Sequence, residues 1–98
     1  MPFSAQLTDE AKATLEELQR DAGLAKRLKA VRKTLAMLES NPRHPGLRSH
    51  KFQSWSGPHG EEVFEVYAEQ GTPAAYRVFW CYGAKRGEII IIAITSHP

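Results

Sequence analysis

Two segments near the end of the chain constrain its fold more than any other feature. Residues 76–82 alternate as a strand does, with Tyr76, Val78, Trp80 and Tyr82 on one face and Arg77, Phe79 and Cys81 on the other. Residues 88–95 are apolar on both faces, which is typical of a strand in the middle of a sheet. Arg77 and His97, just past the second segment, are therefore able to meet at one sheet surface.

Length and composition predict a single domain over residues 1–98. The chain is long enough for a hydrophobic core but has no apolar run approaching a membrane span. No basic head followed by an apolar run opens the chain, so no secretion signal is expected. Cys81 is the only cysteine, which excludes an internal disulfide and favours a soluble cytoplasmic protein.

The formal net charge of +2 is unevenly distributed. Residues 24–51 hold most of the basic side chains against a single acidic one, Glu39, whereas the segments before and after are net acidic. The basic residues of this block are Lys26, Arg27, Lys29, Arg32, Lys33, Arg43, Arg48 and Lys51. Such a block favours a polyanion or an acidic protein as partner, and a solvated helix face is the simpler alternative.

Apolar spacing predicts two helices before any long strand. Thr8 is placed to cap the first, whose apolar positions recur every three or four residues until Gly23 closes it. The second runs from Leu24 to Leu38 and is expected to end at Asn41-Pro42, because proline disfavours helical geometry in the residue before it.

From Leu47 onward the pattern is extended. Four strands are predicted at residues 47–55, 63–69, 76–82 and 88–95, and residues 3–7 are expected to add a short edge strand. Short connections containing glycine favour antiparallel hairpins. The predicted class is α+β: an N-terminal helical hairpin packed on one face of a mainly antiparallel four- to five-stranded sheet.

The order and spacing of the predicted elements and of several short motifs resemble the RelE/ParE toxin superfamily. The resemblance rests on the two-helix start, the Asn41-Pro42 break, residues 46–52 (GLRSHKF), residues 76–80 (YRVFW) and residues 92–97 (IAITSH). It covers nearly the whole chain and implies the toxin of a bacterial toxin–antitoxin pair. RelE- and YoeB-like members cleave mRNA in the ribosomal A site, whereas ParE-like members inhibit DNA gyrase without cleaving RNA.

The likeness to the YoeB-like branch places Arg77 and His97 on active-site positions. Cleavage without a metal uses the 2′-hydroxyl to attack the adjacent phosphate, which requires a base, cationic stabilisation of the phosphorane and an acid. Arg77 would stabilise charge and His97 would be the acid. His50 and Lys51 would contact the phosphate or complete a proton relay. No cofactor is implied.

The resemblance also implies a cognate antitoxin that covers the basic surface. The expected contacts, which are also the expected RNA contacts, are Lys29, Arg32, Lys33, Arg48 and Lys51. The ribosome and mRNA are the further expected partners, or gyrase in the ParE-like alternative, and no membrane is expected.

Two departures from the family pattern leave alternatives open. Gly46 stands where YoeB-like enzymes have a carboxylate base, and the second main strand is acidic, with Glu61, Glu62, Glu65 and Glu69. Either Glu65 takes over as base, or the chain is a non-catalytic protein such as a ParE-like gyrase inhibitor, a domesticated relative or a plain interaction module.

Simpler structural roles also remain for the candidate residues. Arg77 is also able to pair with Glu65 or Glu69 across strands, and His97 to be a terminal residue without a role. His44, His50, His59, Cys81 and His97 show no short metal-ligand spacing, so no metal site is predicted.

Overall fold

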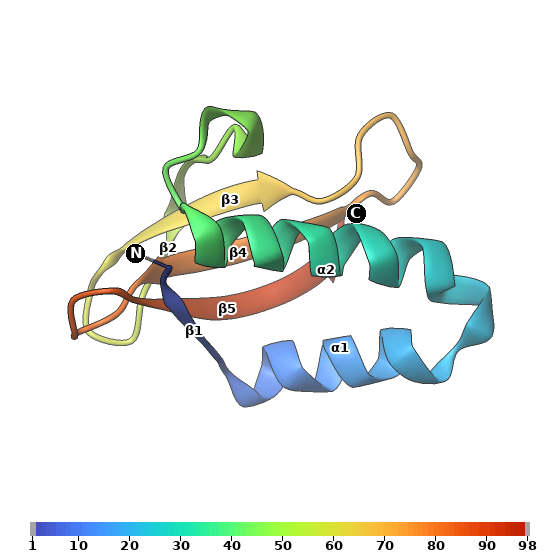
Figure 1. The fold of residues 1–98 in the computed structure, drawn as a ribbon, viewed down its shortest axis with the longest axis horizontal. Helices are drawn as coiled ribbons and strands as arrows, with labels where there is room; N and C mark the ends of the chain where they lie inside the picture. Colours follow the sequence, from blue (N-terminus) through green and yellow to red (C-terminus); the bar gives the residue numbers. More distant parts are fainter. Residues whose placement is uncertain (1, 98) are drawn as a thin grey trace.

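The chain folds as two helices packed on one face of a five-stranded sheet (Figure 1). The computed structural model describes residues 2–97, and Met1 and Pro98 lie outside it. The helices are α1 (Asp9–Arg20) and α2 (Ala25–Ser40). The strands are β1 (Ser4–Leu7), β2 (His50–Ser56), β3 (Glu62–Tyr67), β4 (Tyr76–Tyr82) and β5 (Glu88–Ser96). The predicted α+β class is confirmed.

The first helix begins where its cap was predicted but ends earlier. The Thr8 hydroxyl accepts a hydrogen bond from the backbone N–H of Ala11, at 3.1 Å. The helix ends at Arg20, before the predicted Gly23, because Asp21 is extended and its carboxylate accepts from the Gly23 N–H at 2.9 Å. Asp21 therefore opens a separate 3-10 turn, η1 (Ala22–Leu24), that leads into α2.

The strand order β1-β5-β4-β3-β2 places β5 inside the sheet. β1 pairs with β5 in parallel, and the other three pairings are antiparallel. Both faces of β5 also meet an apolar cluster, because Ile89, Ile91 and Ile94 pack toward the helices while Ala93 packs on the opposite side. This explains the apolar character of both its faces.

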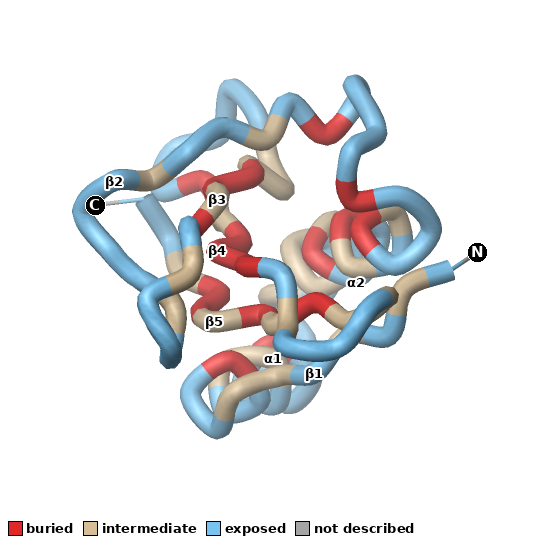
Figure 2. The backbone as a smooth tube through the Cα atoms, turned by 90° about the vertical axis from the view of Figure 1, so that its left-hand side faces the viewer, coloured by how far each residue is buried: buried red, intermediate tan, exposed pale blue. Residues whose placement is uncertain are grey.

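The helices cover one face of the sheet and leave the other without helical cover (Figure 2). α1 packs against β5 and α2 against β4, over a core that contains Val31, Leu38, Val78 and Trp80. The face turned away from both helices is called the open face. Neither helix in residues 2–97 has the length and apolar character needed to cross a lipid bilayer.

β2 begins three residues later than the apolar pattern predicts. Leu47 was expected to open this strand, but it ends a 3-10 turn, η2 (Pro45–Leu47), and is buried in the helix-side core. Arg48 follows in the left-handed region with φ of 52°, so the chain changes direction before His50 starts the strand. A buried turn residue gives the same apolar signal as a strand residue, which is why the start was misplaced.

Cys81 gives a pH-dependent test of this packing. Burial, with a smaller contribution from the nearby Glu61 charge, raises the pKa of its thiol from 9.0 to about 11. The folded state therefore holds this proton between about pH 9 and 11 while the unfolded chain releases it, so stability falls as pH rises through that interval. The free energy of unfolding should be measured in urea for wild type and Cys81→Ala at roughly pH 8, 9, 10 and 11. Above about pH 9 it should fall more steeply for wild type than for Cys81→Ala. If the unfolding free energies of the two proteins fall in parallel as the pH rises, the burial of the thiol is contradicted.

Candidate active site on the open face of the sheet

Three side chains from three neighbouring strands meet on the open face. His50 of β2 lies opposite Glu65 of β3, and Arg77 of β4 lies opposite Tyr67, two residues along from Glu65. Residues two apart on a strand share a face, so this register points all three charged groups to the same side of the sheet. They are called the His50–Glu65–Arg77 cluster.

Glu65 is the centre of this cluster. One of its carboxylate oxygens lies 2.6 Å from His50 Nε2, and the other accepts a hydrogen bond from Arg77 Nη1 at 3.0 Å. The exposed fraction of the side chain is 7% for Glu65, 14% for Arg77 and 57% for His50. A buried carboxylate is thus shared between a nearly buried guanidinium and an imidazole that solvent reaches.

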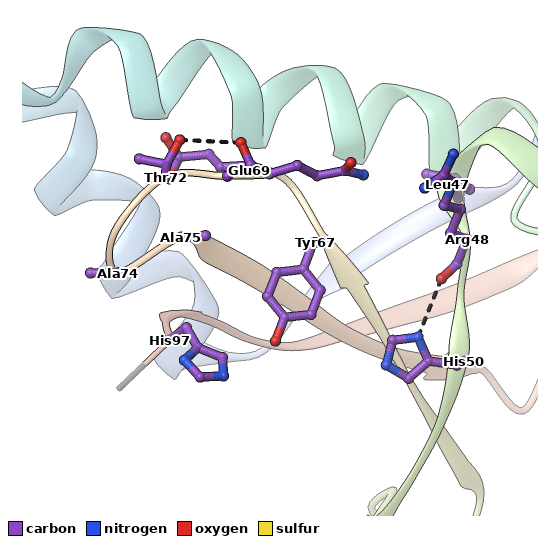
Figure 3. A pocket seen from close by; sticks show the side chains of 11 residues that line it. Leu47, Arg48, His50, Tyr67, Glu69, Thr72, Ala74, Ala75 and His97 are labelled. Atoms are coloured by element: carbon purple, nitrogen blue, oxygen red, sulfur yellow. Dashed lines mark hydrogen bonds between the residues drawn. The ribbon is translucent and has the colours of Figure 1, made fainter.

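The backbone of Arg48 sets the position of the His50 ring. Its left-handed conformation brings the Arg48 carbonyl oxygen to 3.3 Å from His50 Nδ1, as the dashed line in Figure 3 shows. The ring is therefore held at one nitrogen by Glu65 and approached at the other by a carbonyl. The contact at Nδ1 is long, and in the tautomer with the proton on Nε2 this nitrogen has a lone pair that can accept from a hydroxyl.

An aromatic layer supports Arg77 from below. Its guanidinium carbon lies 4.8 Å from the centroid of the Phe79 ring, and Phe79 packs in turn against Phe52 and Trp55. Arg77 Nε is buried and has no hydrogen-bond partner among the described residues. The guanidinium is thus positioned by Glu65 and by packing on Phe79, with donors beyond the one that Glu65 uses.

A pocket of about 560 Å³ adjoins the cluster and shares His50 with it. Figure 3 shows the Tyr67 ring between His50 and His97, and the Tyr67 and His97 rings have centroids 6.0 Å apart. The His97 backbone N–H donates to the Ala75 carbonyl, which fixes the last residues against the start of β4. His97 thus lies on the same side of the molecule as the cluster, at the far end of this pocket.

The connection between β3 and β4 forms one wall of the pocket, and α2 holds it. Arg27 donates to the carbonyl oxygens of Pro73 and Ala74, both at 2.9 Å. Glu69 lies 3.9 Å from Arg27 and accepts from the Tyr76 N–H at 3.0 Å. Arg27 thus secures the pocket wall, although in the sequence it is one more member of the basic block.

The remaining predicted residues lie away from the cluster. Lys51 follows His50 in β2 and so points to the helix side, where it pairs with Glu62 at 3.1 Å. Lys29, Arg32 and Lys33 lie on the exposed surface of α2. Tyr67 and Arg27, which sequence reasoning assigned no site role, carry no local motif, since only the folded register brings them to the pocket.

The acidic second strand does not present a continuous negative surface to the open face. Glu65 lies on the open face within the cluster, Glu62 pairs with Lys51 on the other side, and Glu69 faces Arg27. Within residues 2–97, no three His, Cys, Asp or Glu side chains are grouped as metal ligands would be.

The cluster is expected to stabilise the fold through Glu65. Glu65→Gln keeps the size of the side chain but removes the charge opposite the nearly buried Arg77, and we expect a loss of about 3 kcal/mol in unfolding free energy. Glu62→Gln is the matched control, since its pair with Lys51 is exposed and should change stability by no more than about 0.5 kcal/mol. Equal losses in urea titrations would show that the cluster does not hold the strands together.

The fold is similar to one that occurs in a known protein complex. No protein-family model matches the chain, and no curated protein matches its sequence. Among solved structures, it is similar to a chain of the archaeal RelE–RelB complex from Pyrococcus horikoshii, with a TM-score of 0.65 and 14% identity. The match covers 98% of this chain and 96% of that one. The chain therefore has the RelE-like fold.

Proposed function

We propose that this chain is the toxin of a toxin–antitoxin pair and that it cleaves mRNA on the ribosome. The His50–Glu65–Arg77 cluster on the open face of a RelE-like fold is the observation that carries the proposal. It joins a carboxylate, an imidazole and a guanidinium within hydrogen-bonding distance. These are the groups that metal-free RNA cleavage requires.

The first proton transfer runs through His50 to Glu65. Glu65 is too buried to meet a ribose directly, whereas His50 is exposed and lies 2.6 Å from it. In our proposal His50 carries its proton on Nε2, toward Glu65, so that Nδ1 has a free lone pair and takes the proton of the 2′-hydroxyl. The proton on Nε2 passes to Glu65, so Glu65 is the final base.

The remaining steps involve Arg77 and His97. The 2′-oxygen forms a bond to phosphorus, and the bond from phosphorus to the 5′-oxygen breaks. Arg77 would stabilise the phosphorane with the donors that Glu65 does not use. His97, at the far end of the pocket, would protonate the leaving 5′-oxygen, which yields a 2′,3′-cyclic phosphate and a 5′-hydroxyl.

One observation favours a second candidate, a non-catalytic toxin of the ParE-like kind. Arg77 already has a carboxylate partner and its side chain is only 14% exposed. A phosphate must therefore compete with Glu65 for the guanidinium. On this alternative the cluster is structural and the protein acts by binding gyrase, with no cut in RNA.

The nuclease proposal predicts which substitutions relieve toxicity. Induced expression in a bacterial host should arrest growth, and Arg77→Ala and His97→Gln should relieve the arrest. In translation reactions programmed with a defined mRNA, His50→Gln should slow A-site cleavage by about 100-fold or more, because it removes the proton relay. Lys85→Gln, in the turn between β4 and β5, should behave as wild type.

The outcomes separate the two candidates. Full toxicity of both the Arg77 and the His97 variants would refute the catalytic assignment. Inhibition of DNA supercoiling with intact mRNA would favour the gyrase alternative.

The proposal also includes an antitoxin as partner, which the basic surface of α2 would attract. Lys29, Arg32 and Lys33 are exposed on that helix, and like charges brought together there would draw an acidic segment. Reversing all three to glutamate should lower the association rate with the partner encoded beside the gene by about tenfold or more at low salt, with a smaller change in the dissociation rate. An unchanged association rate in stopped-flow measurements would show that this helix surface is only solvated.

A further inference from the structure

Trp55, near the end of β2, places an exposed aromatic ring on the open face. The exposed fraction of this residue is 41%, whereas Phe79, on which it packs, is buried. Strict alternation along β2 would send Trp55 to the side of the sheet opposite His50. The pairing of β2 with β3 is irregular between Lys51 and Ser56, however, and this irregularity turns the indole to the open face.

Two rings hold the Trp55 indole in place. Its centroid lies 4.4 Å from that of Phe79, and Phe52 meets it edge-on at 5.3 Å. Because these contacts fix one side of the indole, its exposed part keeps a set orientation. A ligand that stacks on it therefore costs little ordering of the side chain.

Phe79 joins this indole to the His50–Glu65–Arg77 cluster. The Phe79 ring carries the Arg77 guanidinium at 4.8 Å as well as the indole, and Phe79 lies opposite Glu65 in the pairing of β3 with β4. Arg77 and Phe79 are two residues apart on one strand, which is roughly 7 Å. One or two nucleotides cover that distance, so a single RNA strand is able to touch both the guanidinium and the indole.

The indole and the open-face pocket lie at opposite ends of the cluster. Ala75 lines the pocket just before β4 begins, whereas Phe79 lies further along that strand, beyond Arg77. An RNA strand with its phosphate at the cluster thus has the pocket on one side and the exposed ring on the other.

The surroundings of Trp55 favour an uncharged ring over a phosphate. Glu61 and Glu62 line a hollow of about 290 Å³ beside it. Lys51, a cation among the described residues of this lining, already pairs with Glu62 at 3.1 Å. A phosphate is therefore repelled here and attracted at Arg77, whereas a nucleobase has a π face and carries no charge.

A protein surface matches this place less well than a base does. Within residues 2–97 the exposed large hydrophobic side chains are Trp55 and Tyr82, and Tyr82 packs on Trp80 at the helix side. Trp55 is thus an isolated exposed ring on the open face. A stable protein interface requires a much wider apolar area, whereas one indole is enough for one base.

We propose that Trp55 stacks a base of the RNA whose scissile phosphate lies at Arg77. The inference rests on the proposed function and adds to it a contact that sets the position of the strand. Proteins commonly hold single-stranded RNA by stacking its bases on aromatic side chains. Because every base has a π face, Trp55 contributes affinity and no preference for one codon.

The Trp55 indole N–H makes the proposal testable by NMR on the whole chain. The probe is a 2′-O-methyl adenosine trinucleotide, which cannot be cleaved because its 2′-oxygen is blocked. In 15N-labelled protein it should move the Trp55 indole resonance upfield, since a stacked base shields that proton, with a dissociation constant of ~1 mM. The Trp80 indole, which is 1% exposed on the helix side, should stay in place as the internal reference. An abasic trinucleotide with the same backbone should leave the Trp55 resonance unmoved.

Three variants test the stacking further, with binding followed on the backbone amides of β4. Trp55→Ala should bind the adenosine trinucleotide about tenfold more weakly than wild type, and Trp55→Phe, which keeps a ring, no more than about threefold more weakly. Tyr82→Ala is the matched control, because it removes an exposed ring from the helix side, and it should bind as wild type. The abasic comparison uses the wild-type chain, so it decides even if Trp55→Ala does not fold.

The proposal is overturned if the Trp55 indole does not move with ~10 mM adenosine trinucleotide, if the abasic strand moves it equally, or if Trp55→Ala binds as wild type. It is also overturned if sedimentation shows that the wild-type chain self-associates and that Trp55→Ala is monomeric, because a second copy then covers the indole. Cleavage of mRNA with an unmoved indole would refute the stacking alone, and a moved indole without cleavage would refute the nuclease proposal alone.

Discussion

The buried carboxylate of Glu65 is the constraint around which the open face is organised. A charge this deep in the sheet is tolerable only with a partner close by, and Arg77 and His50 each take one of its oxygens. The two partners belong to the strands on either side of β3, so satisfying one carboxylate fixes the relative positions of β2, β3 and β4. The same contacts bring together the groups that phosphate chemistry requires.

This arrangement depends on the unequal covering of the two sheet faces. The helices occupy one face, where the large apolar side chains of β4 and β5 lie. The other face has a smaller apolar cluster of Val63, Phe79 and Ala93, and polar side chains adjoin it. Arg77 rests on Phe79 at the boundary between them. A polar site can form there without disturbing the main core.

Local patterns predicted the elements well, and their failures have physical causes. Alternation along residues 76–82 placed Arg77 on the correct face, and the double-sided apolar segment correctly indicated an inner strand. The start of β2 was misplaced at Leu47, because a buried turn residue and a strand residue are equally apolar. Adjacent His50 and Lys51 were grouped in one role, although pleating sends neighbouring residues to opposite faces. The contacts of Arg27 with residues 73 and 74 lie nearly half the chain away and leave no local signal.

The basic block between residues 24 and 51 is divided by folding into parts with different surroundings. Arg27 is tied to the β3–β4 connection, Lys51 is paired with Glu62, and Arg48 turns the chain into β2 beside the open-face pocket. Lys29, Arg32 and Lys33 remain on the surface of α2, where attraction is long in range but weakened by salt. One run of positive charge in the sequence thus yields an arginine that secures a loop, a surface ion pair and three exposed cations on α2. Net charge alone therefore does not indicate where a partner is held, because folding gives these cations different neighbours.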